Sequence, residues 1–469
     1  MDLERLIAAL GPLEVRGGAP TEIADLAYDT RQVGPGALFF CVPGERVDGH
    51  DLAVEAVDRG AKALVVERPL ELTVPQLVVP SARAAMPVLA DEFFERPTEA
   101  LVVAGVTGTN GKTTTAFLIH AIFEAAGMQP GLIGTVESRV GGESRPAVRT
   151  TPEAIDLQRI FRAMLDAGDR SCVLEATSHG SVLGRLDRVR FDALAFTNLT
   201  QDHLDFHGSM DDYYEAKRRL FTEHEPPPAA AVNVGDEWGR RLADELRVLD
   251  RAPLLTFGLV DEAELAWDDV AIETRLHGRF NQENILAAGA ISKLVGVPAA
   301  AVEEGLAGLP GVPGRFEAVD EGQPFTVLVD YAHTPDSLAN VLRTARELTA
   351  AKLICVFGCG GDRDRGKRPE MGRIATELAD VAIVTSDNPR SEDPHAIIDE
   401  ILVGVDEEVF VEPDRRAAIG RAIEQASEGD VVVVAGKGHE QGQEFADRKV
   451  PFDDREVARE ALRRLGAPA

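Results

Sequence analysis

Short apolar runs alternate along most of the chain with stretches whose hydrophobic residues recur at a helical period. Runs of this kind, bounded by glycine, proline and polar residues, predict buried strands, and their alternation with helices predicts parallel sheets covered by helices. We therefore expect an α/β protein with strands in segments 37–42, 63–66, 76–79, 101–106, 172–174, 325–329, 353–357, 381–385 and 431–435.

Two turn-rich segments divide this pattern into three parts. The first part ends near Arg96-Pro97, and the second ends in the segment LPGVPG at 309–314. A chain of 469 residues also fits about three domains at roughly 100 to 200 residues each. We expect a small N-terminal α/β domain over 1–97, a central P-loop mononucleotide-binding domain with a parallel sheet over 98–312, and a C-terminal Rossmann-like α/β domain over 313–469.

Composition narrows the classes of partner. A net charge of -30 opposes binding to nucleic acid or to an anionic membrane, because the long-range field repels phosphate. No apolar stretch approaches the roughly 20 residues of a membrane span, and the first residues lack the pattern of a signal peptide. We expect a cytoplasmic monomer without membrane insertion. The four cysteines are scattered, which favours reduced, structural thiols.

Polar residues and glycines cluster after almost every expected strand. The central part carries such clusters at 107–112, 175–179 and 197–203, and the last part carries them at 330–333, 358–364, 387–390 and 436–440. Open α/β sheets bind ligands in the crevice beyond the carboxyl ends of their strands. Two crevices, one per domain, would form a bipartite active site.

One cluster lies between the strand at 101–106 and a helix expected at 113–126. A glycine-rich strand–loop–helix turn aims backbone N–H groups and a helix N-terminus at an anion. Lys112 would reach the terminal phosphates of a nucleotide, and the Thr113 hydroxyl would bind the bridging magnesium ion. The spacing departs from the strict P-loop, since Val106 stands where the first glycine belongs, and an ordinary βα turn is the alternative. The expected ATP-binding residues are Gly108, Thr109, Asn110, Gly111, Lys112, Thr113 and Thr114.

The segment 106–114 resembles the ATP-binding signature of the Mur ligase family, which includes folylpolyglutamate synthases and cyanophycin synthetases. Segments 197–207, 278–284 and 330–336 match further family motifs in the same order, so the resemblance covers essentially the whole chain. It is strongest to the tripeptide-forming members. This resemblance implies an ATP-dependent ligase that adds meso-diaminopimelate to UDP-N-acetylmuramoyl-L-alanyl-D-glutamate through an acyl phosphate, in peptidoglycan precursor synthesis.

The resemblance also implies a set of catalytic residues and a Mg²⁺ site. Glu175 follows an apolar run and offers a hard oxygen ligand. Lys217 occupies the position at which the family carries a carbamylated lysine, although a lone helical lysine is ordinarily solvated. His203 has a structural alternative as a buried histidine. The expected catalytic residues are Lys112, Glu175, His203 and Lys217, and the expected metal ligands are Thr113, Glu175, His203 and carbamylated Lys217.

Four more residues are expected at the nucleotide. By resemblance, Asn281 contacts adenine, Arg315 reaches the phosphates from the third domain, and Asp330 and His333 approach from the same side. An ordinary turn residue is the alternative for Asp330. Closure of the third domain would then complete the site and keep water from the acyl phosphate.

The UDP-sugar-peptide is expected between the first and second domains. The residues implied by resemblance are Tyr28, Thr30, Glu45, Arg46, Thr150, Thr151, Thr177 and Arg185. Relatives often carry a glutamine where this chain has Leu183, which puts the contact of that side chain in doubt.

The amino acid is expected in the third domain, at Arg363, Asp387, Asn388, Pro389, Arg390, Gly436 and Glu440. Diaminopimelate differs from lysine by a second carboxylate, which Arg390 can bind with two parallel hydrogen bonds. Asp387, Asn388 and Glu440 are expected to offer oxygen acceptors to the distal ammonium.

Three other functions are open at this stage. An L-lysine-adding ligase would use the same nucleotide sugar, but Arg390 argues against it. A folylpolyglutamate synthase lacks the roughly 100 residues that precede the P-loop here. A P-loop ATPase or regulator without ligase activity would not need the third-domain cluster.

Overall fold

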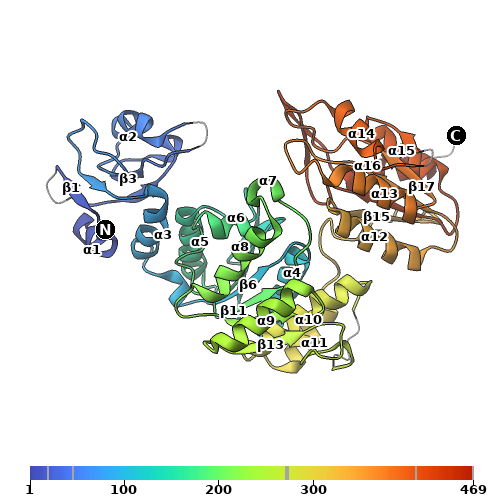
Figure 1. Ribbon diagram of the computed structural model, residues 1–469, viewed down its shortest axis with the longest axis horizontal. Coiled ribbons are helices and arrows are strands. Elements are labelled where there is room, and N and C mark those ends of the chain that lie inside the picture. Colours follow the sequence, from blue (N-terminus) through green and yellow to red (C-terminus); the bar gives the residue numbers. More distant parts are fainter. Residues whose placement is uncertain (18–20, 45–46, 270–273, 407–408, 467–469) are drawn as a thin grey trace.

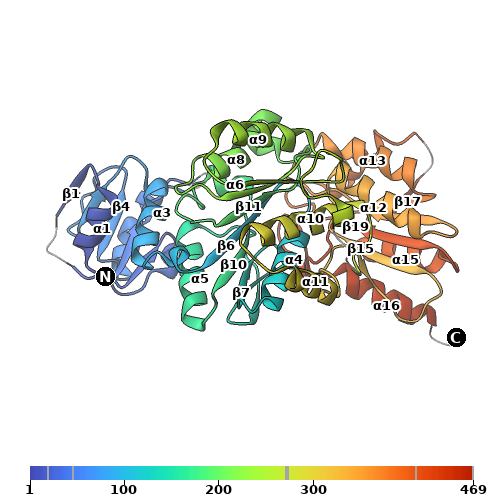
Figure 2. The ribbon, with the colours of Figure 1, turned by 90° about the horizontal axis from the view of Figure 1, so that it is seen from below.

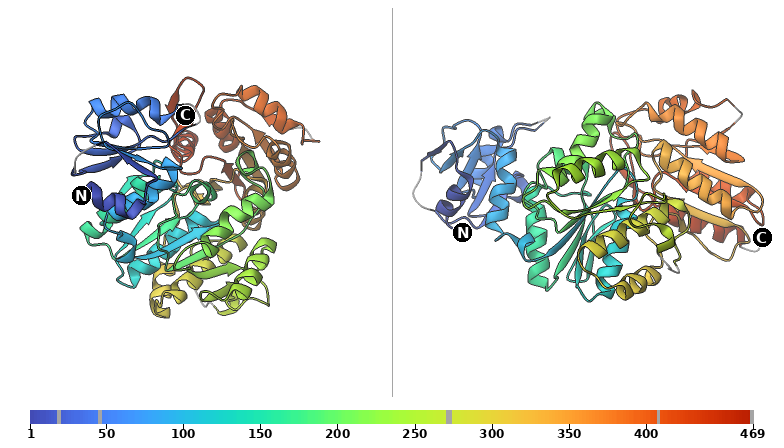
Figure 3. Two further views of the ribbon diagram at one scale, coloured as in Figure 1. Left: turned by 60° about the vertical axis from the view of Figure 1, so that its left-hand side comes forward. Right: turned by 60° about the horizontal axis from the view of Figure 1, so that its bottom comes forward.

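The computed structural model describes residues 1–17, 21–44, 47–269, 274–406 and 409–466. Three large sheets of five, eight and six strands follow one another along the chain. Figure 1 shows the three corresponding bodies in a row, with the N-terminal body in blue, the central one in green and yellow, and the C-terminal one in orange and red. The right-hand view of Figure 3 likewise places the central body between the other two.

The first body contains a sheet with strand order β1-β5-β4-β3-β2, parallel except for the pair β1 and β5. Helices α1 and α3 cover one face and α2 covers the other. The elements are α1 (Leu3–Leu10), β1 (Glu14–Arg16), β2 (Asp25–Ala27), η1 (Thr30–Gln32), β3 (Ala37–Phe40), η2 (Gly49–Leu52), α2 (Ala53–Asp58), β4 (Ala63–Val66), β5 (Gln76–Val78), α3 (Ala82–Phe93) and η3 (Pro97–Glu99).

The central body is built on a sheet of order β13-β12-β11-β6-β10-β7-β8-β9. Helices α4, α10 and α11 cover one face, and α5, α8 and α9 cover the other (Figure 2). The strands are β6 (Val102–Thr107), β7 (Pro130–Ile133), β8 (Glu137–Val140), β9 (Glu143–Pro146), β10 (Ser171–Glu175), β11 (Ala193–Phe196), β12 (Ala229–Asn233) and β13 (Leu254–Phe257). The helices are α4 (Lys112–Ala125), α5 (Ala154–Ala167), α6 (Ser178–Val182), α7 (Leu204–His207), α8 (Met210–Thr222), α9 (Glu237–Leu249), η4 (Trp267–Asp269), α10 (Arg279–Leu294) and α11 (Ala299–Gly308).

The third body has the strand order β14-β15-β19-β16-β17-β18, with α12, α13 and α14 on one face and α15 and α16 on the other. A separate ribbon pairs β20 with β21. The elements are β14 (Glu317–Ala318), β15 (Thr326–Asp330), α12 (Pro335–Leu348), β16 (Leu353–Phe357), α13 (Lys367–Leu378), β17 (Val381–Val384), α14 (Pro394–Leu402), β18 (Phe410–Val411), α15 (Arg415–Gln425), β19 (Val431–Ala435), β20 (Gly442–Glu444), β21 (Lys449–Pro451) and α16 (Asp454–Gly466).

Strand register decides where the polar clusters lie. In the central sheet, Glu175 pairs with Val106 and Phe196 pairs with Thr107. The carboxyl ends of β6, β10 and β11 therefore lie side by side, and the residues that follow them share one edge. In the third sheet, Asp330 pairs with Ala435, so β15 and β19 also end together.

Two expectations about the whole chain can be compared with this fold. All four cysteines are buried free thiols, so the expectation of reduced, structural cysteines is confirmed. Over the described ranges, no helix is both long enough and apolar enough to cross a bilayer.

Candidate active site

A cavity of about 640 Å³ lies where the central body meets the third one. Most of the expected nucleotide residues line it together, although they come from strands, loops and helices far apart in the chain. The expected residues among its lining are Thr109, Asn110, Gly111, Lys112, Thr113, Thr114, Thr150, Glu175, Thr177, His203, Arg315, Asp330 and His333.

The loop between β6 and α4 needs glycine at two positions. Gly108 has φ +150°, and a Cβ added there would lie 1.9 Å from the Thr197 hydroxyl. Gly111 has φ +86°, and its added Cβ would lie 2.3 Å from the side-chain oxygen of Asn284. Both positions combine a backbone conformation that favours glycine with a close neighbour. The loop can therefore wrap tightly at the N-terminus of α4, where backbone N–H groups attract phosphate.

Lys112, the first residue of α4, bends back over this loop. Its Nζ donates to the carbonyls of Gly108 at 2.9 Å and Thr109 at 2.8 Å. Burial lowers the pKa of this ammonium, and the nearby carboxylates of Glu175 and Asp202 oppose that shift. A phosphate entering the loop would meet a cation that is already desolvated.

Glu175 ends β10 and is 1% exposed. Its carboxylate accepts hydrogen bonds from the Thr113 hydroxyl at 3.0 Å and from the Thr135 backbone N–H at 2.7 Å and hydroxyl at 2.9 Å. The Thr113 hydroxyl and the Glu175 carboxylate thus present adjacent hard oxygen atoms at the phosphate end of the cavity. These are the donor types that magnesium prefers.

Lys217 on α8 is fully buried beneath the same loop. Its Nζ donates to the Gly108 carbonyl at 2.8 Å and lies 4.6 Å from the centre of the Tyr213 ring. Burial lowers the pKa of this amine far below its usual value, and the charge of Lys112 adds to the effect. Burial therefore favours the neutral, nucleophilic form of this amine.

His203 stands at the N-terminus of α7 with φ +56°, in the left-handed region. Its ring meets that of His179 at 4.7 Å between centres, and its Nε2 lies 3.4 Å from Asp202 Oδ2. Burial lowers the pKa of His203 to about 3, against the opposing charge of Asp202. The imidazole is therefore neutral and can act as a ligand or hydrogen-bond partner.

Arg315 brings the third body to the phosphate end of the cavity. Its Nη2 donates to the Thr113 hydroxyl at 3.0 Å, and its guanidinium lies 4.3 Å from the centre of the Tyr331 ring. The other terminal nitrogen, Nη1, is buried and has no hydrogen-bond partner in the described part of the chain. A buried donor of this kind suits an anion bound in the cavity.

Asp330 lines the cavity and also supports the turn that carries this arginine. Its carboxylate accepts from the backbone N–H groups of Phe316 at 2.6 Å and Ala332 at 2.7 Å. These bonds hold the turn that carries Arg315 against the end of β15. Asp330 was expected at the nucleotide, and it lies beside Arg315 in the lining of the cavity.

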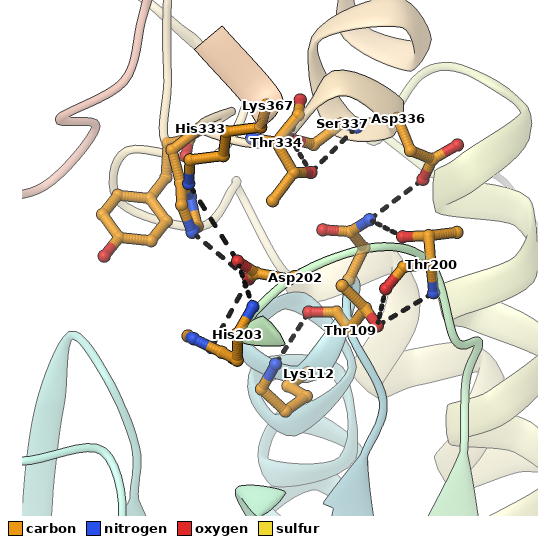
Figure 4. Close-up of polar contacts among 12 residues, drawn as sticks. Thr109, Lys112, Thr200, Asp202, His203, His333, Thr334, Asp336, Ser337 and Lys367 are labelled. Atoms are coloured by element: carbon orange, nitrogen blue, oxygen red, sulfur yellow. Dashed lines mark hydrogen bonds and ion pairs between the residues drawn. The ribbon is translucent and has the colours of Figure 1, made fainter. Parts of the chain in front are cut away.

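Asp202 joins the central body to the third one (Figure 4). His203 lies on the same loop, while His333 Nε2 and Lys367 Nζ approach the carboxylate from the third body at 3.8 and 4.0 Å. Burial alone would raise the pKa of Asp202, but the three basic neighbours outweigh it and lower it to about 2. The Asn110 amide also donates to Asp336 at 2.9 Å across the same boundary. Asp202, Lys367 and Asp336 were not singled out from the sequence.

Asn281 does not line the cavity. Its side-chain nitrogen donates to the His277 carbonyl at 2.7 Å, and its oxygen accepts from Asn284 at 3.2 Å. Asn284, one helical turn further along α10, lines the cavity instead, and so does Glu283, whose pKa burial raises to about 7. The sequence signal for Asn284 was its spacing of three from Asn281, which places both on one side of a helix.

The residues expected to hold the sugar and peptide lie next to Glu175. The Thr151 hydroxyl donates to the Glu175 carbonyl at 2.7 Å and accepts from the Thr177 hydroxyl at 2.9 Å. Arg185 donates to the Thr151 carbonyl at 3.0 Å, and the Thr150 hydroxyl lies 3.1 Å from that of Thr135. These residues therefore form one group at the edge of the sheet where Glu175 ends β10.

The expected uridine residues lie in the first body. The Tyr28 hydroxyl donates to Asp156 on α5 at 2.5 Å, which ties the first body to the central one. Thr30 is buried at the start of η1. Glu45 and Arg46 lie outside the described residues.

The expected amino-acid residues gather at the carboxyl ends of the third sheet. Arg390 has φ +50°, and its side chain donates to the Gly361 carbonyl at 2.7 Å and lies 3.4 Å from the Glu444 carboxylate. Gly436 lies so close to Asp387 that an added Cβ would be 2.5 Å from a carboxylate oxygen. The backbone of Pro389 packs on Gly361 in the same way. Arg363 is exposed on the neighbouring loop, with a hydrogen bond to the Asp362 carbonyl.

A chain of contacts connects this group to the phosphate cavity. Gly314, beside Arg315, packs so closely on the loop after β19 that an added Cβ would lie 2.1 Å from the His439 nitrogen. The Tyr331 ring lies between Arg315 and His439, 5.3 Å from the latter ring centre. His439 also meets the backbone of Thr135, whose side chain binds Glu175. The two polar groups therefore face one another across one domain boundary.

Fold and site together define a class of enzyme, a ligase that uses a nucleotide to join two substrates held by separate domains. The chain belongs to the Mur ligase family, because the models of its catalytic domain, its middle domain and its glutamate ligase domain match residues 22–100, 106–292 and 314–438. It is accordingly an ATP-dependent ligase of the acid–amino-acid class.

Individual relatives agree with this assignment. The chain is 46% identical to the UDP-N-acetylmuramoyl-L-alanyl-D-glutamate–2,6-diaminopimelate ligase of Geobacillus thermodenitrificans, with 99% of each chain covered. It is 47% identical to the enzyme of the same name from Solibacter usitatus, over 96% of this chain and 95% of that one. A solved structure of an enzyme with this name superimposes with a TM-score of 0.66 at 31% identity, over 95% of this chain and 96% of that chain.

Proposed function

We propose that this ligase adds meso-diaminopimelate to UDP-N-acetylmuramoyl-L-alanyl-D-glutamate at the expense of ATP, in the synthesis of peptidoglycan precursors. The observation that carries the proposal is the charged cluster of Arg390, Asn388 and Glu440 at the strand ends of the third sheet, in a domain whose Arg315 lines the phosphate cavity. Relatives that share almost the full length of the chain are named for this reaction.

The proposed chemistry has two steps. A carboxylate of the dipeptide attacks the γ-phosphorus of ATP and releases ADP, which forms an acyl phosphate. The amine of diaminopimelate then attacks the acyl carbon and releases phosphate. The first step brings two negative groups together, and the second releases phosphate, so Lys112 and the unpartnered nitrogen of Arg315 would contribute by neutralising phosphate charge.

The residues at the phosphate end fit a magnesium ion. The ion would be held by the Thr113 hydroxyl, the Glu175 carboxylate, His203 and Lys217 as its carbamate, and would neutralise the phosphates when bound. Within the described ranges, no three His, Cys, Asp or Glu side chains gather as a metal cluster. The proposed ligand set contains only two such side chains, Glu175 and His203. The Thr113 hydroxyl and the carbamate of Lys217 supply the other two ligands.

Carbamylation of Lys217 is supported by its surroundings. Carbon dioxide reacts with a neutral amine, and burial favours that form of Lys217 by lowering its pKa. The carbamate would replace a cation with an anionic oxygen ligand directly beneath the phosphate loop. Mass spectrometry of the intact protein in bicarbonate should then show an added carboxyl group that is lost in Lys217→Gln.

The remaining assignments complete the proposal. Residues 1–97 and the group around Thr151 would hold the UDP-sugar-peptide, residues 98–312 would bind ATP, and residues 313–469 would supply the amino-acid pocket. The proposed enzyme acts as a monomer. ATP and the nucleotide sugar are cytoplasmic compounds, and the proposal puts the reaction there.

The decisive experiment follows phosphate release with purified enzyme. We expect release only when the UDP-muramoyl-dipeptide and meso-diaminopimelate are both present, and little release when L-lysine replaces diaminopimelate. Release without either substrate would favour a plain ATPase, and equal use of lysine would favour a lysine-adding ligase.

Arg390→Lys tests the amino-acid pocket itself. A lysine keeps the charge but loses the two parallel hydrogen bonds of a guanidinium. We expect the KM for diaminopimelate to rise by about tenfold or more, as for loss of one charge-assisted hydrogen bond, with the KM for ATP unchanged. Unchanged diaminopimelate kinetics would remove Arg390 from the pocket.

A further inference from the structure

Lys437 is a buried cation inside the proposed amino-acid pocket. The sequence assigned no role to this residue. It lies in the loop after β19 and its side chain is 0% exposed. Its Nζ lies 2.7 Å from Asn388 Oδ1, 3.1 Å from Glu440 Oε2 and 3.7 Å from Asp387 Oδ1. The three residues expected to receive a substrate ammonium are thus already in contact with an ammonium of the protein.

These contacts fix the orientation of the Asn388 amide. Lysine Nζ and a backbone N–H can only donate, and both Lys437 Nζ and the Glu444 N–H, at 3.0 Å, face the same Asn388 atom. That atom must therefore be the oxygen. The other amide atom lies 2.7 Å from a Glu440 carboxylate oxygen, which can only accept, so it must be the nitrogen. The orientation follows from the chemistry of the partners.

The polarity of the pocket follows from this orientation. Both lone pairs of Asn388 Oδ1 are occupied, and one of its two N–H groups is bound to Glu440, which leaves one N–H donor. Glu440 Oε2 accepts from Asn388 and Lys437, while Oε1 has no hydrogen-bond partner in the described chain. The free group of Asn388 is therefore an N–H donor, whereas an oxygen acceptor was expected. The free group of Glu440 is its acceptor oxygen Oε1.

We propose that Lys437 is a positioning residue that turns Asn388 into a donor for the distal carboxylate of the amino-acid substrate, beside Arg390, and reserves one Glu440 oxygen for the distal ammonium. The inference rests on the proposed function, because that substrate must carry both groups. Lysine has no second carboxylate and would leave the Asn388 donor unpaired. Lys437 would thus act on amino-acid choice without touching the substrate.

A double-mutant cycle tests this role. Lys437→Met removes the donor and keeps a side chain of similar length, and Asn388→Ala removes the group on which Lys437 acts. We expect Lys437→Met to lower kcat/KM for meso-diaminopimelate by about 10- to 100-fold, mostly through KM. In the Asn388→Ala background the same change should cost less than about threefold, because coupled residues are not additive. The KM values for ATP and the nucleotide sugar should stay within about twofold.

Two further variants provide a control and a replacement for Lys437→Met. Lys449→Met makes the same chemical change at an exposed lysine of the neighbouring strand β21 and should leave all constants unchanged. If Lys437→Met does not fold, the cycle is run with Lys437→Gln, which removes the charge but keeps a polar group. The preference for diaminopimelate over lysine should fall in Lys437→Met, and it should fall less in Lys437→Gln, because the glutamine amide can still donate to Asn388.

The outcomes separate the inference from the function on which it rests. Multiplicative effects in the cycle, or an equal rise in the KM for ATP, would overturn the positioning role while the wild type still used diaminopimelate. A wild type that does not use diaminopimelate would overturn both. A loss confined to diaminopimelate and abolished by Asn388→Ala would establish the role.

Discussion

The guanidinium of Arg315 donates to the hydroxyl of Thr113 at 3.0 Å, between positions 202 residues apart in the chain. Thr113 is the second residue of the helix behind the phosphate loop, and its hydroxyl also donates to Glu175. Arg315 begins the third domain, so the contact ties that domain to the phosphate end of the cavity. The chemistry proposed for the site depends on this closed arrangement.

Arg315→Ala should lower kcat by about 100- to 1000-fold, as for loss of one preorganised donor to a developing charge. Arg315→Lys should recover part of the loss, because it restores charge but not the second donor. Steady-state phosphate release measures both. Arg373→Ala, at an exposed surface pair with Glu377, is the control and should behave as wild type. Equal activity in Arg315→Ala would show that this side chain does not meet the phosphates.

Gly108→Ala should abolish nucleotide binding, because the added methyl group would lie 1.9 Å from the Thr197 hydroxyl at a φ that disfavours alanine. The matched change Gly420→Ala lies inside α15, where an added Cβ meets nothing within 4 Å. It should stabilise the protein by about 0.5 to 1 kcal/mol. Isothermal titration with ATP and thermal unfolding separate the two effects, and normal ATP affinity in Gly108→Ala would contradict the tight loop.

Asp202→Asn should loosen the third domain from the central one. The amide keeps the shape of the carboxylate but loses the charge that faces His333 and Lys367 across the boundary. We expect a larger radius of gyration by small-angle scattering and a lower kcat, with unchanged binding of the nucleotide sugar. Asp211→Asn, at an exposed pair with Arg241, should change neither quantity. An unaltered scattering curve would show that Asp202 does not hold the domains together.

His120 should make stability depend on pH in mild acid. Burial on α4 lowers its pKa to about 4, from about 6.5 in an unfolded chain. The unfolded state therefore binds more protons between these values, and stability should fall as the pH decreases from about 6.5 to 4, by up to about 1.4 kcal/mol per unit.

Urea unfolding of His120→Phe measures this contribution. The change in unfolding free energy between pH 7 and pH 5 should be smaller in this variant than in the wild type, whatever its absolute stability. His395→Gln, at an exposed histidine, should leave the change as it is. The same slope in His120→Phe and wild type would exclude His120 as its source.

Local pattern was enough to place nine of the strands, among them the central strands of all three sheets. Runs 63–66, 353–357 and 431–435 coincide with β4, β16 and β19, and the other expected strands differ from the observed ones by only a few residues at their ends. A short apolar run bounded by turn residues favours an interior strand. A few adjacent residues are therefore enough to predict it. The glycines of the phosphate loop are equally local, because their backbone conformation and their place before α4 are set within the loop.

Packing between distant segments decided the rest. Asn281 carries the motif, but the rotation of α10 turns its amide toward His277 and exposes Asn284 to the cavity. Lys437 and Asn388 meet across 49 positions of the chain, and their contact, together with those of Glu440 and Glu444, decides which atom of the amide faces a ligand. The sequence by itself determined the strands, the phosphate loop and the kinds of groups at each strand end. Which of those groups face one another, and with which atom, depends on sheet register and domain contact, since hydrogen bonds between distant residues leave no periodicity in the chain.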